Sequence, residues 1–425
     1  MAATGETIVA LSSGRPPAAI AVIRISGEAA AASAIALAGK LPNPRQAALR
    51  TLRDPGSGEA IDDALTLFFP GPKSATGENI VEFQCHGSRA IVDRVIEVLT
   101  ALDGVRLAEP GEFTRRALAN GLIDLTEAEG LADLLAAETE LQRKVALVRA
   151  SGGLRAKLDS WRQALVRLSA DAEVAIDYPD EEDGVMAPDL RPAATELLNE
   201  IRDLLDAPRT EKLRDGIRVV LAGPPNAGKS SLINALTYSE RAIVTPIAGT
   251  TRDTIEIPIA MDGMPFVFVD TAGLRDANDE VEAIGVGRAR DEMAAADIIL
   301  WLGPDHDIPA SARTLLLRPK ADLGSSGAGL PVSSKTGLGL SDLRQRLLDR
   351  ARATLPSGVS VMLTNREASL LGEIHTILLQ CIQIAAPEIR AELLRQAREL
   401  VDQITGRAGV ENVLDELFSR FCLGK

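Results

Sequence analysis

The sequence contains few cysteines and histidines, and it lacks any long apolar run. Its three cysteines and three histidines are too scattered for a disulfide framework or a zinc-ligand pattern. The adjacent Cys85 and His86 predict ordinary packing, with a metal site as the alternative. No stretch approaches the roughly 20 apolar residues of a membrane span, and the first ten residues lack a basic and apolar secretory signal. We expect a cytoplasmic protein that does not enter a membrane.

Basic residues are also in the minority. Sixty acidic residues against 46 basic ones give a formal charge of −14. This balance opposes a broad phosphate-gripping surface and excludes a sequence-indifferent nucleic-acid coat, although it allows a local RNA contact. The length of 425 residues corresponds to roughly three domains.

The hydrophobic periodicity of the sequence changes three times along the chain. Residues 1–120 mix short strand-like and helical segments, which predicts an α+β domain. Residues 121–216 and 357–425 have helical periodicity, and residues 217–356 alternate apolar strands with helices as in a parallel sheet. The simplest interpretation is a helical domain with an α/β domain inserted into it, and four independent segments are the alternative.

A phosphate-binding loop follows the first apolar strand of the α/β region. The strand at 217–222 leads into Gly223-Pro224-Pro225-Asn226-Ala227-Gly228-Lys229-Ser230, and a helical segment from Ser231 follows. Glycines let successive backbone amides point at phosphates, Lys229 reaches the β and γ oxygens, and the Ser230 hydroxyl ligates Mg²⁺.

Further nucleotide motifs follow in order, each at the end of a predicted strand. Asp270 ends an apolar strand and would hold the Mg²⁺ shell, while Gly273 would contact the γ-phosphate through its N–H. The segment around Asp322 resembles the base-recognition loop of guanine-nucleotide proteins, in which such a carboxylate accepts from guanine N1 and N2. Together these motifs predict a Ras-like G domain, whose further nucleotide contacts would be Thr271, Ala272, Lys320, Ser333, Ser334 and Lys335.

Two positions depart from the usual G-domain pattern. Pro319 stands where such proteins carry Asn, and proline has neither a side-chain amide nor a backbone donor, so we expect a weakened guanine contact. Leu274 stands where Ras-like GTPases place the glutamine that orients the attacking water. Another residue must therefore orient that water.

Over essentially its whole length the sequence resembles the MnmE (TrmE) family of tRNA-modification GTPases. The resemblance rests on the loop at 226–231, on segments 7–10, 24–27, 110–114 and 180–182, and above all on the terminal Phe421-Cys422-Leu423-Gly424-Lys425. It implies a homodimer joined through amino-terminal folate-binding domains. It also implies an FAD-dependent MnmG-type partner, with which (carboxymethyl)aminomethyl groups are added to C5 of the tRNA wobble uridine.

The resemblance also assigns roles within the G domain. Glu282 would orient the hydrolytic water, although from sequence alone it could be a solvated acid at a helix start. Thr251 would join Ser230 on Mg²⁺. A K⁺ ion would stabilise developing charge on the phosphates. Its implied ligands are Asn226, Thr245, Ile247 and Thr250. Asn226, Thr245, Thr250 and Thr251 would also belong to the GTP site.

The implied folate site takes a tetrahydrofolate derivative, 5,10-methylene or 5-formyl. Its residues would be Arg24, Glu82 and Lys425, and Leu122 replaces a lysine common in the family, which would weaken the binding. Cys422 is a candidate functional thiol, with a small buried residue as the alternative.

Two competing functions stay open at this stage. A GTP-binding ribosome or RNA assembly factor would need neither the amino-terminal domain nor the Cys-x-Gly-Lys tail. A P-loop ATPase is permitted by Pro319 but disfavoured by Asp322. Nucleotide competition would distinguish the ATPase from the GTPase.

Overall fold

The computed structural model describes residues 5–177, 189–239, 241–242, 255–270, 290–307, 309, 311–324, 327–355, 361–408, 411–419, 421 and 424. The chain folds into two compact units, one from 1–132 with 402–425 and the other from 133–401. Among the described residues, no helix has both the length and the apolar character needed to cross a bilayer.

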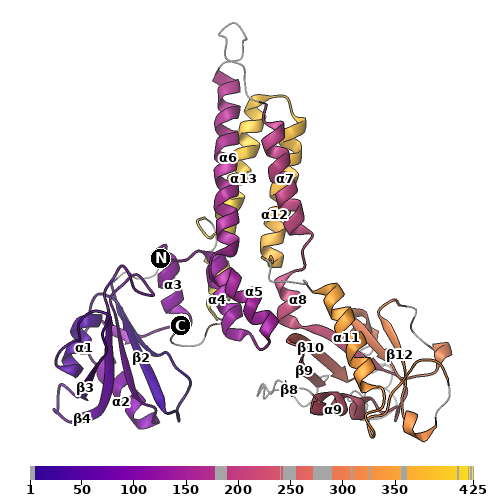
Figure 1. The fold of residues 1–425 in the computed structure, drawn as a ribbon. Helices are drawn as coiled ribbons and strands as arrows, with labels where there is room; N and C mark the ends of the chain where they lie inside the picture. The colour runs from indigo at the N-terminus through magenta and orange to yellow at the C-terminus, as the bar shows by residue number, and fades with distance from the viewer. Residues whose placement is uncertain are drawn as a thin grey trace, which may run out of the picture. The chain divides into compact units, whose positions relative to one another are not determined.

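A six-stranded sheet is the centre of the first unit (Figure 1), with strand order β3-β4-β5-β2-β1-β6. Neighbouring strands are antiparallel except for the parallel pair β1 and β6. Alternate residues of each strand share a face, and one face packs with two helices into a buried core. The elements are β1 Thr7–Leu11, β2 Ile20–Ser26, α1 Ala30–Ala38, β3 Ala48–Arg53, β4 Ala60–Phe69, β5 Ile80–His86, α2 Arg89–Thr100, β6 Val105–Leu107 and α3 Glu112–Ala119.

The carboxyl-terminal segment completes this first unit. Helix α14, Glu411–Ser419, packs with α3 and with the start of α4, Leu125–Ala136, around the buried Phe418 and Phe421. The Arg115 guanidinium lies 5.1 Å from the centre of the Phe418 ring and pairs with Asp415 at 2.8 Å. Residues some 300 positions apart therefore share one core.

The second unit contains a seven-stranded sheet in the order β13-β12-β11-β7-β10-β9-β8. Strands β13 to β10 are parallel in that order, and β9 and β8 continue antiparallel. Helices α9 and α11 contribute to the main core beside this sheet. The elements are β7 Ile217–Ala222, α9 Lys229–Ser239, β8 Arg241–Ala242, β9 Ile255–Met261, β10 Met264–Asp270, β11 Ile298–Trp301, η3 Asp305–Asp307, β12 Thr314–Arg318, η4 Ala321–Leu323, β13 Leu330–Pro331 and α11 Leu340–Thr354.

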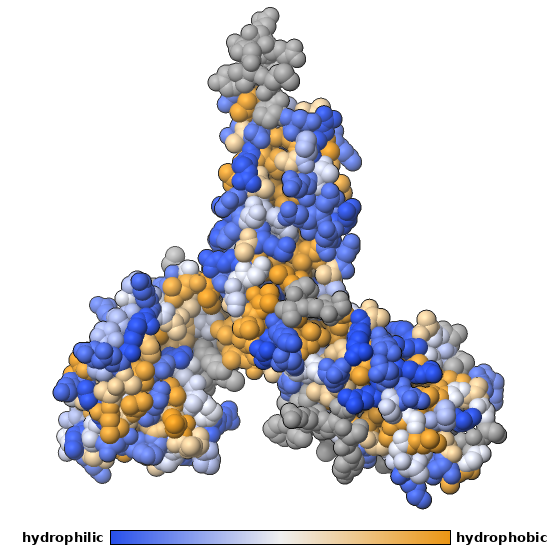
Figure 2. Space-filling model, viewed as in Figure 1, coloured by the Kyte–Doolittle hydropathy of each residue, from blue (hydrophilic) through white to orange (hydrophobic). Residues whose placement is uncertain are grey.

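Long helices make up the rest of the second unit. Helix α7 packs against α6 and α12, and the side chains of α6 that face inward recur at helical spacing, from Leu154 to Leu168. Hydrophilic side chains cover much of the visible face of these helices (Figure 2). The predicted combination of an α+β domain, helices and a parallel α/β domain is confirmed. The helices are α5 Glu140–Ala150, α6 Gly153–Asp177, α7 Arg191–Leu205, α8 Thr210–Asp215, α12 Asn365–Gln383 and α13 Pro387–Ile404.

Candidate functional site

The predicted phosphate loop connects the central strand β7 to helix α9. Gly223 and Gly228 have φ angles of +143° and +98°, which side chains with a Cβ rarely adopt. A Cβ on Gly223 would lie 3.0 Å from the Leu302 carbonyl carbon, so the close approach of β11 also requires glycine there. The loop thus places the amino terminus of α9 at the carboxyl edge of the sheet, which is an anion-binding arrangement.

Lys229, the first residue of α9, is folded back over this loop. The residue is 6% exposed, and its Nζ donates to the carbonyl oxygens of Gly223 and Pro224, both at 3.0 Å. These two contacts hold the ammonium group above the concave side of the loop, where phosphate oxygens could replace the carbonyl oxygens.

Ser230 and Asp270, for which the sequence predicts Mg²⁺ roles, lie within hydrogen-bond distance of each other at the base of the loop. Parallel pairing of β10 with β7 places Asp270 opposite Leu221, one residue before the end of β7. The Ser230 hydroxyl donates to Asp270 Oδ2 at 2.5 Å. A hydroxyl and a carboxylate are hard oxygen ligands, and this pair fits Mg²⁺ bound to a nucleotide.

The predicted base-recognition loops lie beside the phosphate loop. Lys320 Nζ donates to Asn226 O at 2.9 Å, so strand β12 delivers its loop to the phosphate site. Ala321 N donates to Val332 O at 3.1 Å, which ties η4 to the segment after β13. In that segment Ser333 is buried and its hydroxyl accepts from Thr336 N, whereas Ser334 and Lys335 are exposed.

Several predicted site residues lie outside the described residues. They are Thr245, Ile247, Thr250, Thr251, Thr271, Ala272, Gly273, Leu274 and Glu282 in the G domain, and Cys422 and Lys425 in the tail.

The first unit brings two of the predicted folate residues together. Arg24 and Glu82 are directly opposed on β2 and β5, on the sheet face away from the α1 and α2 core. Arg24 Nε donates to Glu82 Oε1 at 2.8 Å. The guanidinium also lies 5.6 Å from the Phe113 ring centre, a contact that sequence reasoning missed because the 89 positions between the two residues leave no local signal. Leu122, after α3, is 39% exposed.

Gly424 of the tail is docked against the end of β1. The Ser12 hydroxyl donates to Gly424 O at 2.8 Å. A Cβ on Gly424 would lie 2.1 Å from Leu11 O, and the φ of +90° also requires glycine. The sequence motif has thus a structural basis at this residue.

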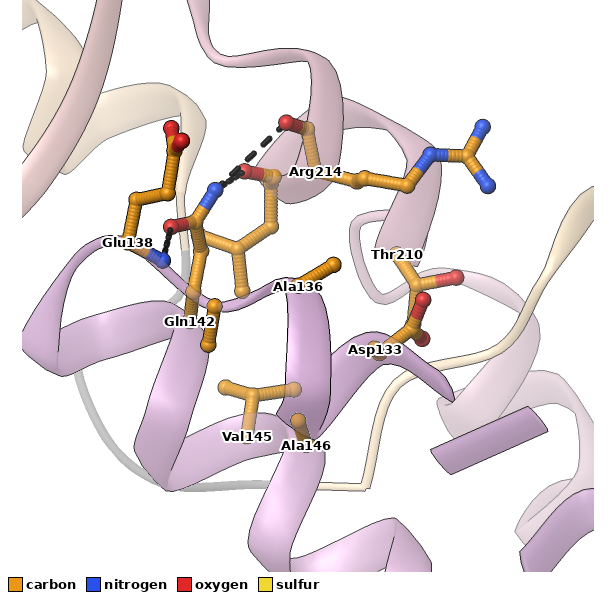
Figure 3. A pocket seen from close by; sticks show the side chains of 10 residues that line it. Asp133, Ala136, Glu138, Gln142, Val145, Ala146, Thr210 and Arg214 are labelled. Atoms are coloured by element: carbon orange, nitrogen blue, oxygen red, sulfur yellow. Dashed lines mark hydrogen bonds between the residues drawn. The ribbon is translucent and has the colours of Figure 1, made fainter. Parts of the chain in front are cut away.

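A cavity of about 70 Å³ lies among α4, α5 and α8 (Figure 3). Gln142 bridges its rim, donating to Leu213 O at 3.1 Å and accepting from Glu138 N at 3.0 Å. Val145 lines its apolar side, and burial raises the pKa of Asp133, which lines it as well. This volume accommodates a few water molecules and is too small for a nucleotide.

Two family models match the chain. The model described as "MnmE helical domain" matches residues 125–422, and the model described as "GTP-binding protein TrmE N-terminus" matches residues 7–122. The tRNA modification GTPase MnmE of Erythrobacter litoralis is 51% identical over 424 residues, covering 99% of this chain and all of the relative. That of Novosphingobium aromaticivorans is 47% identical over 435 residues, with 99% and 100% coverage.

Among solved structures, the G domain of the T. maritima FeoB iron transporter is similar to part of the chain. It matches 32% of this chain and 98% of its own length, at 22% identity and a TM-score of 0.25. These values are too low to bear on function.

Proposed function

The chain belongs to the MnmE (TrmE) family of tRNA modification GTPases, and from this premise we propose that it is a K⁺-stimulated GTPase that modifies the wobble uridine. With an FAD-dependent MnmG-type partner it would install a (carboxymethyl)aminomethyl group on C5. Methylenetetrahydrofolate would supply the one-carbon unit, and FAD would reside on the partner.

The proposal for the nucleotide site rests above all on the Ser230–Asp270 contact beneath the phosphate loop. When bound there, Mg²⁺ would neutralise charge on the β- and γ-phosphates. Ser230 would ligate the ion with Thr251, and Asp270 would orient its shell. Lys229 would exchange its two carbonyl acceptors for phosphate oxygens, a stronger charge-assisted contact.

We assign the remaining steps of hydrolysis to residues around this centre. Glu282 would orient the attacking water, because Leu274 stands at the position where other GTPases carry the glutamine that does so. Asn226, whose φ of +60° places it at the tight turn of the loop, would bind K⁺ together with Thr245, Ile247 and Thr250. The cation would supply positive charge where other GTPases use an arginine.

The folate proposal is supported by the exposed side of the Arg24–Glu82 pair. The Arg24 side chain is 26% exposed and the Glu82 side chain 16% exposed, so both reach solvent on a shared sheet face. A guanidinium suits the glutamyl carboxylates of folate, and a carboxylate suits pterin N–H groups. Docking of Gly424 at Ser12 would bring Lys425 into the same unit as this pair.

We further propose that the protein acts in the cytoplasm as a homodimer bound to its partner and to tRNA. The net charge of −14 fits a division of labour in which the partner provides most of the phosphate contacts.

The deciding experiment compares GTP hydrolysis by the full chain in KCl and NaCl at equal ionic strength. We expect a rate at least about tenfold higher in K⁺, since a bound cation stabilises the transition-state charge. Asn226→Ala should lower the rate in KCl to the NaCl level. Asn365→Ala, at an exposed asparagine beginning α12, is the matched control and should retain the stimulation. Equal wild-type rates in the two salts would contradict the K⁺ mechanism.

A further inference from the structure

The part of the chain from 311 to 355 is basic, although the protein as a whole is acidic. It carries eight lysines and arginines against three aspartates, a net charge of +5, whereas the whole chain has −14. This part contains strand β12 and helix α11, which lie beside each other at one end of the nucleotide sheet (Figure 1). A basic region within an acidic chain indicates a local surface for an anionic partner.

A groove of about 410 Å³ lies along β12 within this basic region. Residues 314–317 of the strand and 329–331 of the following segment line it, and Arg346 lines it from α11. Strand β13 pairs with only the last two residues of β12, so no described strand covers the first three residues of β12 on that side. A groove of this volume has room for one nucleotide unit of an RNA chain.

Four arginines lie around this groove, and none of them forms an ion pair with a residue that the structure describes. They are Arg313, Arg318, Arg346 and Arg350. Arg313, before β12, donates to Ala296 O at 2.7 Å, and Arg350 of α11 donates to Arg313 O at 2.6 Å. Arg318, the last residue of β12, donates to Gly327 O at 2.6 Å, while Arg346 has no hydrogen bond to a described residue. These contacts use neutral carbonyl oxygens, so no bound carboxylate neutralises the four charges.

Two of these arginines repel each other. Arg346 and Arg350 lie one turn apart on the same face of α11. Burial lowers the pKa of Arg350, and the charge of Arg346 lowers it further. Asp342, one turn before Arg346, forms no ion pair with it, and Asp349 accepts instead from Gln345 at 2.8 Å. An anion in the groove would relieve this repulsion, because a guanidinium donates two parallel hydrogen bonds to a phosphate.

We propose that the groove between β12 and α11 binds a phosphate of the tRNA backbone, and that Arg346 is the residue that contacts it. Arg350 and the arginines at the two ends of β12 would add favourable charge around this phosphate while they keep their carbonyl contacts. This inference rests on the proposed function, since it takes tRNA as the polyanion that the chain meets. It identifies where an otherwise acidic protein contacts the nucleic acid.

The test measures binding of a fluorescently labelled tRNA transcript, with uridine at the wobble position, to the full chain by anisotropy. Arg346→Glu should weaken binding at least about tenfold at about 50 mM KCl. Arg346→Ala should reduce the slope of log K against log salt by about one, because one phosphate contact is lost. Arg202→Glu is the control, since it makes the same charge change at an exposed arginine of α7, and it should bind within about twofold of wild type.

The possible outcomes separate this proposal from its alternatives. Equal weakening by Arg346→Glu and Arg202→Glu would overturn it, because the effect would then follow net charge alone. Undetectable binding of tRNA to wild type at about 50 mM KCl would overturn it as well. Binding of labelled poly-glutamate that is lost in Arg346→Glu, with tRNA binding unchanged, would assign the groove to an acidic protein segment instead. GTP hydrolysis without RNA should be the same in wild type and all three variants, whereas a wild type without hydrolysis would contradict the GTPase function itself.

Discussion

Gly424 is a single residue on which the docking of the tail depends. In Gly424→Ala the Cβ would meet Leu11 O at 2.1 Å, so we expect the tail to detach from β1. Gly39→Ala is the control, because Gly39 also has a positive φ, +72°, but open space around its Cβ position. Hydrogen exchange of residues 402–425 should accelerate in the first variant only, and affinity for 5-formyltetrahydrofolate should fall with it. Unchanged exchange would show that the contact does not hold the tail.

Asp133 is a single carboxylate whose charge opposes folding. Burial raises the pKa of Asp133 in the folded chain above the unfolded value of 3.8. The protonated, neutral Asp133 is the form that the fold tolerates. The stability associated with this neutral form is therefore fully present below pH 3.8, and it is lost as the pH rises through the folded pKa and the carboxylate becomes charged. We expect Asp133→Asn to raise the melting temperature at pH 7, with the gain shrinking as the pH falls toward 4.

The control for this prediction is Asp203→Asn, at an exposed carboxylate on α7. It should leave the melting temperature almost unchanged at both pH values. A lower melting temperature for Asp133→Asn at pH 7 would mean that the charged form is favoured by contacts around the cavity (Figure 3).

Helices α5 and α12 are joined by a buried ion pair. Arg149 and Glu367 are both fully buried and form two hydrogen bonds, at 2.9 and 3.0 Å. Glu367 also accepts from Thr364 N at 2.7 Å, within the capping box that begins α12. The pair thereby fixes the segment through which the chain leaves the α/β domain.

Glu367→Gln should lower the free energy of unfolding by about 3–5 kcal/mol, because it removes the charge of the carboxylate that pairs with the buried Arg149 guanidinium. Replacing both partners by Arg149→Met and Glu367→Leu should recover much of this loss. Glu392→Gln, which breaks an exposed pair with Arg395, is the control and should have little effect. Urea unfolding followed by circular dichroism measures the three variants against wild type, and a loss below about 1 kcal/mol for Glu367→Gln would refute the prediction.

At the level of elements, the sequence was informative where local patterns determine structure. Strand periodicity and loop composition predicted β7, its phosphate loop and the following helix, and Asp270 was placed correctly at the end of a strand. The Lys320–Asn226 contact and the Arg149–Glu367 pair join residues 94 and 218 positions apart. No local periodicity encodes such pairs, since only the tertiary fold brings them together.

The adjacent Cys85 and His86 show what alternation along a single strand determines. Neighbouring residues on β5 point to opposite faces, so Cys85 is buried in the core while His86 is exposed. Burial raises the pKa of the Cys85 thiol to about 12, and His86 Nδ1 instead contacts Asp62 at 2.7 Å. The packing interpretation accounts for both residues.

At the scale of the whole molecule, the two segments that connect the α/β region to the helices run side by side. Arg209, before β7, bridges to Leu363, after α11, and Thr210 N donates to Leu363 O at 2.9 Å. Val145 of α5 belongs to the same hydrophobic cluster as the strands of the nucleotide sheet. The division at 120, 216 and 356 stays a prediction, but this shared core explains why 133–401 forms one compact unit.

The Ser12–Gly424 contact spans 412 residues and has a consequence for biosynthesis. During translation the amino-terminal sheet leaves the ribosome long before the segment that docks against the end of β1 is made. At roughly 5–20 residues per second, the delay is on the order of tens of seconds. Until then Leu125 and Ala128 lack the apolar partners that Phe418 and Phe421 provide. The nascent chain therefore carries an apolar surface that stays partly uncovered until the last residues of the sequence have been made.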